Sequence, residues 1–198
     1  MPNWCNNDLY ISGDKDSIKK FKLAAKGPTQ TYNDFREHES KWPEKLDDIR
    51  LKVLSEQLPE PGPISDFSFH ALFPVPDEIR RLPYDCNQAN KIRKALGLEE
   101  EVQGGYSWES SNWGCKWGGS EATLWSAEET SLHYGFDTPW GPPEPFIDKI
   151  SKDWPDLHFE LHYEEPGMNF RGEYHVQNGE ELYSYTAECD EPSEDEEE

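Results

Sequence analysis

The sequence has no long apolar run. No stretch approaches the roughly 20 consecutive apolar residues that a membrane-spanning helix requires. Residues 1–7 also lack the basic and apolar regions of a signal peptide. We therefore expect no membrane partner and a cytoplasmic location.

Cysteine is scarce and has no clustered spacing. The four cysteines are spread along the chain without a Cys-x-x-Cys pair, which fits neither a zinc ribbon nor a disulfide framework. Free thiols are expected, and no cofactor or metal is predicted. The cysteines are Cys5, Cys86, Cys115 and Cys189.

Basic residues are nearly absent from the second half of the chain. Residues 1–94 contain 15 Asp and Glu against 15 Lys and Arg, whereas residues 95–198 contain 26 acids against four basic residues. The net charge of −22 therefore arises in the second half. Residues 188–198 contain eight acids, and without them the charge is still −14. This segment has no apolar pattern, and we predict a disordered acidic tail.

Aromatic residues are plentiful. Hydrophobic residues make up 34% of the 198 residues, but 13% are aromatic and eight are Trp. A few large side chains must therefore carry much of the apolar burial, and an aromatic-rich core is expected. The length fits a single domain with insertions.

In the first half, short apolar patterns alternate with turn signals. Residues 7–13 predict a strand, and the spacing of Ile18, Phe21 and Ala25 predicts a helix that ends at Gly27. An insertion is expected over 28–63, with a helix over about 44–58. Alternating apolar residues from Phe67 to Phe73 predict a second strand, and a partly basic helical stretch follows over about 80–96.

From about residue 104 the pattern changes toward strands, beginning with a Gly-, Ser- and Trp-rich segment over 106–117. The predicted strands are 122–127, 132–136, 157–163, 173–177 and 182–186, with a helix opened by Pro142-Pro143. The last two strands are joined across Asn178-Gly179, a hairpin signal.

The element order, strand, helix, strand, then strand, helix, strand, is that of the split βαβ ferredoxin-like plan. We predict an α+β, ferredoxin-like domain over 1–187, with a mainly antiparallel sheet and helices packed on one face. The helical insertion and the C-terminal hairpin are additions to this plan.

Four ordered phrases carry a family resemblance: Pro-Asn-Trp-Cys-Asn-Asn-Asp-Leu (2–9), Asn-Trp-Gly-Cys-Lys-Trp (112–117), Phe-Asp-Thr-Pro-Trp-Gly-Pro-Pro (136–143) and Tyr-Glu-Glu-Pro-Gly-Met (163–168). With them the chain resembles the YubB-like ferredoxin-like family of phages and plasmids, over roughly 1–25 and 65–187. The resemblance implies a ferredoxin-like fold in a mobile-element setting, hence a bacterial host. The family has no established reaction, and no catalytic residue is carried over.

The segment over 112–117 is the first candidate for contact with a partner. Asn112, Trp113, Lys116 and Trp117 belong to it, and two exposed tryptophans with a lysine between them would form an interface anchor. In the alternative interpretation, both Trp side chains pack under the sheet while nearby glycines permit a tight turn.

Two acidic pairs complete the predicted contact residues: Glu128 with Glu129, and Glu164 with Glu165. They could instead supply a general acid and base, although chance adjacency is expected in a chain with 41 acids. Cys115 beside Lys116 lacks a histidine placed by sequence as its base. We predict no enzyme.

His158, Glu160 and His162 share one face of a predicted strand. Successive same-face residues lie about 6.6 Å apart, so the two histidines are about 13 Å apart and cannot share one ion unaided. A solvated polar face is the prediction.

The charge indicates the class of partner. A net charge of −22 disfavours direct nucleic-acid binding. The acidic second half could instead present a phosphate-like array to a basic, nucleic-acid-handling enzyme. We therefore expect a non-enzymatic binding protein that inhibits or sequesters a host protein with a basic surface. In its specific form, the prediction is that the partner is a host-defence factor that handles nucleic acid, and that this chain binds it as a DNA mimic. The alternatives are an enzyme or small-ligand domain of unknown reaction and, for the charge, plain solubility.

Overall fold

The computed structural model describes residues 2–34, 47, 49, 57–97 and 104–189. A six-stranded sheet runs through it in the order β4-β5-β1-β6-β7-β8, with antiparallel pairing between all neighbours. The strands are β1 (Trp4–Ser12), β4 (Ser120–Ala127), β5 (Ser131–Pro139), β6 (His158–Glu165), β7 (Phe170–Gln177) and β8 (Glu180–Ala187).

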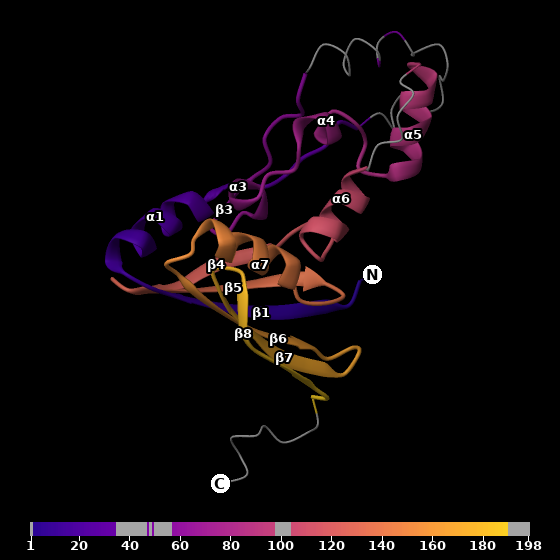
Figure 1. The fold of residues 1–198 in the computed structure, drawn as a ribbon. Coiled ribbons are helices and arrows are strands. Elements are labelled where there is room, and N and C mark those ends of the chain that lie inside the picture. The colour runs from indigo at the N-terminus through magenta and orange to yellow at the C-terminus, as the bar shows by residue number, and fades with distance from the viewer. Residues whose placement is uncertain (1, 35–46, 48, 50–56, 98–103, 190–198) are drawn as a thin grey trace.

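Two helices complete the ferredoxin-like plan, α1 (Lys15–Ala25) after β1 and α7 (Glu144–Asp153) after β5. They lie on the same side of the sheet (Figure 1). The Asp14 carboxylate caps α1 by accepting from the backbone N–H groups of Asp16 and Ser17. The order β1-α1-β4-β5-α7-β6 gives the split βαβ topology. The α+β, ferredoxin-like prediction is therefore confirmed.

The core lies between the sheet and these helices and is rich in aromatic rings, as predicted. In β1 the alternate residues Leu9 and Ile11 are fully buried. Phe21 of α1 makes edge-to-face contacts with Phe159 of β6 and with Trp154, at centroid distances of 5.6 and 5.2 Å. These contacts hold the helical layer against one face of the sheet.

The predicted strand over 67–73 is wrong. Phe69–Leu72 forms a short helix, α3, because the Ser68 hydroxyl accepts from the backbone N–H of Ala71 and caps it. Phe67 and Phe69 are nevertheless both buried, so their alternation reflects burial rather than an extended backbone. The second strand of the ferredoxin-like plan is β4.

Among the described residues between α3 and β4 are the helices α4 (Asp77–Arg80), α5 (Cys86–Ala95) and α6 (Gly105–Asn112). Helix α5 matches most of the helical stretch predicted over about 80–96, whereas α4 reaches only its first residue. The Gly-, Ser- and Trp-rich segment begins as helix α6, rather than opening the run of strands expected from about residue 104.

The two ends of the predicted insertion are held together. β2 (Gly27–Pro28) pairs with β3 (Ile64–Ser65), and the Thr29 N–H donates to the Pro63 carbonyl at 2.9 Å. The helix predicted over about 44–58 lies almost entirely outside the described residues, as does most of the predicted acidic tail. In the described ranges, no helix combines the length and apolar character needed to cross a membrane.

Candidate interaction surface

The face of the sheet turned away from α1 and α7, here called the open face, carries a row of aromatic rings across all six strands. Tyr10 stacks on His133 with a centroid distance of 4.1 Å and an interplanar angle of 19°. On the other side of Tyr10, His162 lies 5.5 Å away in an edge-to-face arrangement. We call the whole row the ring band, which consists of Trp125 (β4), His133 (β5), Tyr10 (β1), His162 (β6), His175 (β7) and Tyr183 (β8).

Strand register builds the ring band. Tyr10 is directly opposite His133 of β5, and His175 is directly opposite Tyr183 of β8. Directly opposed residues in antiparallel strands point to the same face, so each pair brings two rings together. At the β4 edge, Trp125 lies over Gly135, where an added Cβ would come within 2.7 Å of the indole nitrogen. Glycine at this position therefore leaves room for the tryptophan ring.

Carboxylates line the same face, and several pair with its histidines. Asp8 lies 2.7 Å from the His133 Nε2, and Glu160 lies 2.6 Å from the His162 Nε2. Glu173 lies between two rings, 3.5 Å from the Nδ1 of His162 and 3.2 Å from the Nε2 of His175.

These contacts shift the pKa of Glu160 and Tyr10. Burial alone would raise the pKa of the Glu160 carboxyl, but the hydrogen bond with His162 and the nearby histidine charges outweigh burial and lower it. The pKa of the Tyr10 hydroxyl is raised, first by burial and then by the charges of Asp8 and Glu160. The histidines therefore favour the ionised state of Glu160.

The charge of the open face is strongly one-sided. Arg171 is the only Lys or Arg among the residues of the six strands. Beside it lies a hollow of about 270 Å³, lined among others by Asp8, His162 and Glu173. The carboxylates on this face include those of Asp8, Asp137, Glu160, Glu164, Glu173 and Glu180.

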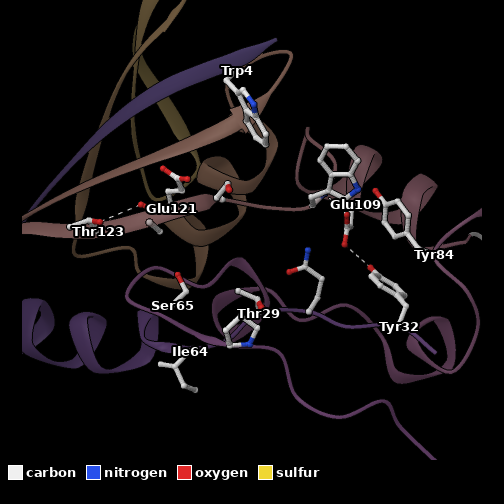
Figure 2. A pocket seen from close by; sticks show the side chains of 15 residues that line it. Trp4, Thr29, Tyr32, Ile64, Ser65, Tyr84, Glu109, Glu121 and Thr123 are labelled. Atoms are coloured by element: carbon white, nitrogen blue, oxygen red, sulfur yellow. Dashed lines mark hydrogen bonds between the residues drawn. The ribbon is translucent and has the colours of Figure 1, made fainter. Parts of the chain in front are cut away.

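A second hollow of about 840 Å³ lies where the sheet meets the ends of the insertion. Glu109 of α6 lies beside Tyr32 and Tyr84 at one end of it, while Glu121 and Thr123 lie at the other (Figure 2). The Glu109 carboxylate is fully buried.

Burial raises the pKa of Glu109, although its hydrogen bonds favour the ionised form. It accepts from the Tyr32 hydroxyl and from the Trp117 backbone N–H, each at 2.6 Å. Burial and the Glu109 charge together raise the pKa of Tyr32 and of Tyr84. The carboxylate thus ties α6 to the segment that follows α1.

The structure separates the contact residues predicted over 112–117. Trp113 is fully buried, packs edge-to-face on Phe69 and donates from its indole N–H to the Phe73 carbonyl. The prediction that it contacts a partner is therefore wrong. Trp117 is 45% exposed, and the Lys116 Nζ lies 4.3 Å from its ring centroid. Asn112 is half-buried at the end of α6 and donates to the Trp108 carbonyl.

The structure also places the residues of the two predicted acidic pairs in different environments. Glu165 is buried because its carboxylate accepts from the backbone N–H groups of Gly167 and Met168 in the turn after β6, so it offers no contact surface. Glu164 is exposed on the open face. Glu128 and Glu129 are exposed in the β4–β5 turn, at the opposite end of β4 from Trp117, and Glu129 pairs with Lys15.

Sequence reasoning missed the ring band. The alternation of His158, Glu160 and His162 correctly indicated one strand face, but the partners of these side chains come from β1 and β7. The alternation of Glu173 and His175 in the β7 sequence was an available signal. This alternation can be related to the ring band only when the order of the strands in the sheet is known.

The strand order and the pairing of the sheet define a ferredoxin-like domain. Residues 112–198 match the family model described as the ferredoxin-like domain in Api92-like protein. The ferredoxin-like fold implied by the predicted resemblance is thus confirmed, whereas the YubB-like family and its phage or plasmid setting stay predictions.

A solved relative supports the same fold. The crystal structure of a protein api92 from Yersinia pseudotuberculosis superimposes with a TM-score of 0.60 at 13% identity, covering 94% of this chain and 98% of that one. Separately, the F component of the A-type ATP synthase of Thermococcus sibiricus is 24% identical over 97 residues, covering 46% of this chain and 95% of that component. That name describes the Thermococcus sibiricus protein and is not transferred to this chain.

Proposed function

We propose that this chain is a non-enzymatic binding protein whose open face docks onto a basic surface of a partner protein. The observation that carries the proposal is the ring band, bordered by several carboxylates and one arginine on a sheet face that α1 and α7 leave uncovered. Exposed rings supply rigid apolar contact area, and the carboxylates select the charge of the partner.

The ring band has accessible anchors. Trp125 is 67% exposed, and Tyr10 and Tyr183 are 41% and 43% exposed. Aromatic side chains of this kind dominate binding energy at interfaces because they bury a large area at little cost in conformational entropy. They are spread across the sheet from β4 to β1 and β8, which suits a broad protein surface better than a small ligand.

The specific form of the proposal is a mobile-element protein that inhibits or sequesters a host factor that handles nucleic acid. Its support is the resemblance to phage and plasmid proteins together with the charge of the open face. An array of carboxylates can occupy a site built for phosphates, because both are anionic hydrogen-bond acceptors.

A small-ligand or enzymatic function is the second candidate, favoured by the 840 Å³ hollow and the buried Glu109. However, Glu109 already accepts bonds from Tyr32 and Trp117. These bonds suit a structural carboxylate better than one that awaits a substrate.

The test is affinity capture from bacterial lysate at low and high salt, using three versions of the chain. The first is the wild type and the second lacks residues 188–198. The third carries Asp8→Lys and Glu164→Lys on the open face. We expect a basic protein to be retained by the first two versions and lost from the third, with retention weakened by salt. Duplex DNA or RNA should compete with this chain for the purified partner.

A matched control keeps the charge change but moves it off the open face. Glu78→Lys with Asp156→Lys alters net charge by the same four units at exposed positions outside the ring band. Equal loss of the partner from both double variants would mean that net charge, and not the open face, governs binding. Retention by the Asp8, Glu164 variant would refute the proposed docking surface.

A further inference from the structure

Three potential metal ligands converge on the open face. Glu160 and His162 come from β6, and His175 comes from the neighbouring strand β7. One donor atom from each lies within 4.8 Å of the other two. His158 and His162 on one strand are too far apart to share an ion. Cross-strand register supplies a different partner, His175.

The contacts around these ligands already resemble part of a coordination sphere. Glu160 contacts the His162 Nε2 at 2.6 Å, and the rings of His162 and His175 have centroids 6.0 Å apart. Ligands at about 2.0–2.1 Å from a tetrahedral zinc ion lie roughly 3.3 Å from one another. Side-chain rotations that lengthen the Glu160–His162 contact and shorten the other separations would therefore create three ligands of a zinc site.

Glu173 contacts both histidines of the cluster. Its two carboxylate oxygens face the Nδ1 of His162 and the Nε2 of His175, at 3.5 and 3.2 Å. A carboxylate bonded to a ligating imidazole fixes the ring orientation and raises its basicity. Glu173 can therefore orient the ring of His162, whose Nε2 contacts Glu160. Alternatively, one of its carboxylate oxygens can serve as the fourth ligand.

We propose that Glu160, His162 and His175 form a binding site for a divalent transition-metal ion, with Zn²⁺ as the preferred probe and Glu173 as the orienting carboxylate. Two imidazoles and a carboxylate are ligands that suit zinc and its neighbours better than the hard ions Mg²⁺ and Ca²⁺. A metal binds the deprotonated forms of these ligands, so affinity falls at acidic pH.

An ion from solvent can reach this site. His162, Glu160 and Glu173 side chains are 34–38% exposed, and His175 is 20% exposed. His162 and Glu173 also line the 270 Å³ hollow of the open face. A bound ion can therefore keep a water molecule as a further ligand.

The experiment is isothermal titration of the full chain with ZnCl₂ at neutral pH, in excess Mg²⁺ so that clustered carboxylates are occupied by the hard ion. The background carries Cys86→Ser and Cys189→Ser, because thiolates bind zinc. We expect one Zn²⁺ per chain. His162→Ala or His175→Ala should reduce affinity at least tenfold, and Glu173→Gln by about 10- to 100-fold.

His133→Ala is the matched control, since His133 also belongs to the ring band and pairs with a carboxylate, Asp8. Its substitution should leave zinc affinity unchanged. The proposed site would be contradicted if His133→Ala and His175→Ala lowered zinc affinity equally. It would also be contradicted if one-site binding survived both His162→Ala and His175→Ala.

A second readout does not depend on any variant. In the wild-type chain, zinc should shift the imidazole NMR resonances of His162 and His175 while those of His70 stay in place. Unshifted His162 and His175 resonances at saturating zinc would contradict the proposal. Both measurements use the chain alone, so their outcome is separate from that of the partner-binding proposal.

Discussion

The two faces of the sheet are built from the same strands and have opposite character. In β1, Leu9 and Ile11 are buried against the helical layer. Asp8 and Tyr10 alternate with them along the strand and belong to the open face. The helical layer also carries the five lysines of α1 and the residue after it: Lys15, Lys19, Lys20, Lys22 and Lys26. The alternation of strand side chains thus separates a buried apolar side from a polar and acidic side, and the lysines of α1 lie in the layer that covers the apolar side.

The excess of acidic residues in the second half of the sequence becomes an excess of negative charge on one face of the sheet. Five of the six strands come from the second half of the sequence, which holds 26 acids and four basic residues. Lysines concentrate on α1, which covers the opposite side. The position of α1 therefore preserves the acidity of the open face.

The largest expected effect is on the covered face. Phe159→Ala removes a fully buried ring that packs on Phe21, and it should lower the free energy of unfolding by about 3–5 kcal/mol. Tyr183→Ala, in the ring band, should change it by about 0.5 kcal/mol or less. Urea unfolding of both variants measures this contrast. Similar losses would mean that the open face contributes to the core.

The next effect concerns the buried Glu109. Its pKa is raised above the ordinary 4.5, so the stability linked to its protonation is present below that value and is lost as pH rises through the raised pKa. Glu109→Gln cannot titrate. Relative to wild type, the variant should therefore gain stability as pH increases above about 4.5.

Unfolding free energies of both proteins, measured from pH 4 to pH 8, test this expectation. Each unit of pKa difference corresponds to about 1.4 kcal/mol. A difference between the two proteins that does not vary with pH would show that Glu109 titrates normally in the folded state.

The smallest effect has the opposite sign and lies on the open face. The pKa of Glu160 is lowered below 4.5, so its contribution to stability is present above that value and is lost as pH falls through the lowered pKa. Because the side chain is 34% exposed, Glu160→Gln should cost about 0–1 kcal/mol at neutral pH, and less in acid. A cost that grows below pH 4.5 would contradict this assignment.

Much of the fold could be predicted from local sequence signals. The alternation in β6 and the Asn178-Gly179 turn gave the C-terminal strands, and the apolar spacing gave α1 and α7. The alternation from Phe67 to Phe73 misled, because three-dimensional packing buried Phe67 and Phe69 around a capped helical turn. Local pattern cannot distinguish these two causes of burial in so short a segment.

The candidate surface was much less predictable. Glu164 faces the open side, but Trp113 and Glu165, chosen for residue type and adjacency, are buried. The ring band depends on which strands are neighbours, and residues as distant as Tyr10 and His133 meet only through β1–β5 pairing. Such a surface becomes visible once the strand order is known.

The pairing of β2 with β3 has a consequence for how the chain can change over time. Gly27 lies opposite Ser65, so the intervening residues leave and re-enter the domain at adjacent points. A segment attached in this way can be lengthened, shortened or exchanged with little change in loop-closure entropy, because that entropy varies slowly with length. The junction therefore allows the length of this segment to vary while the six-stranded sheet and its open face stay the same.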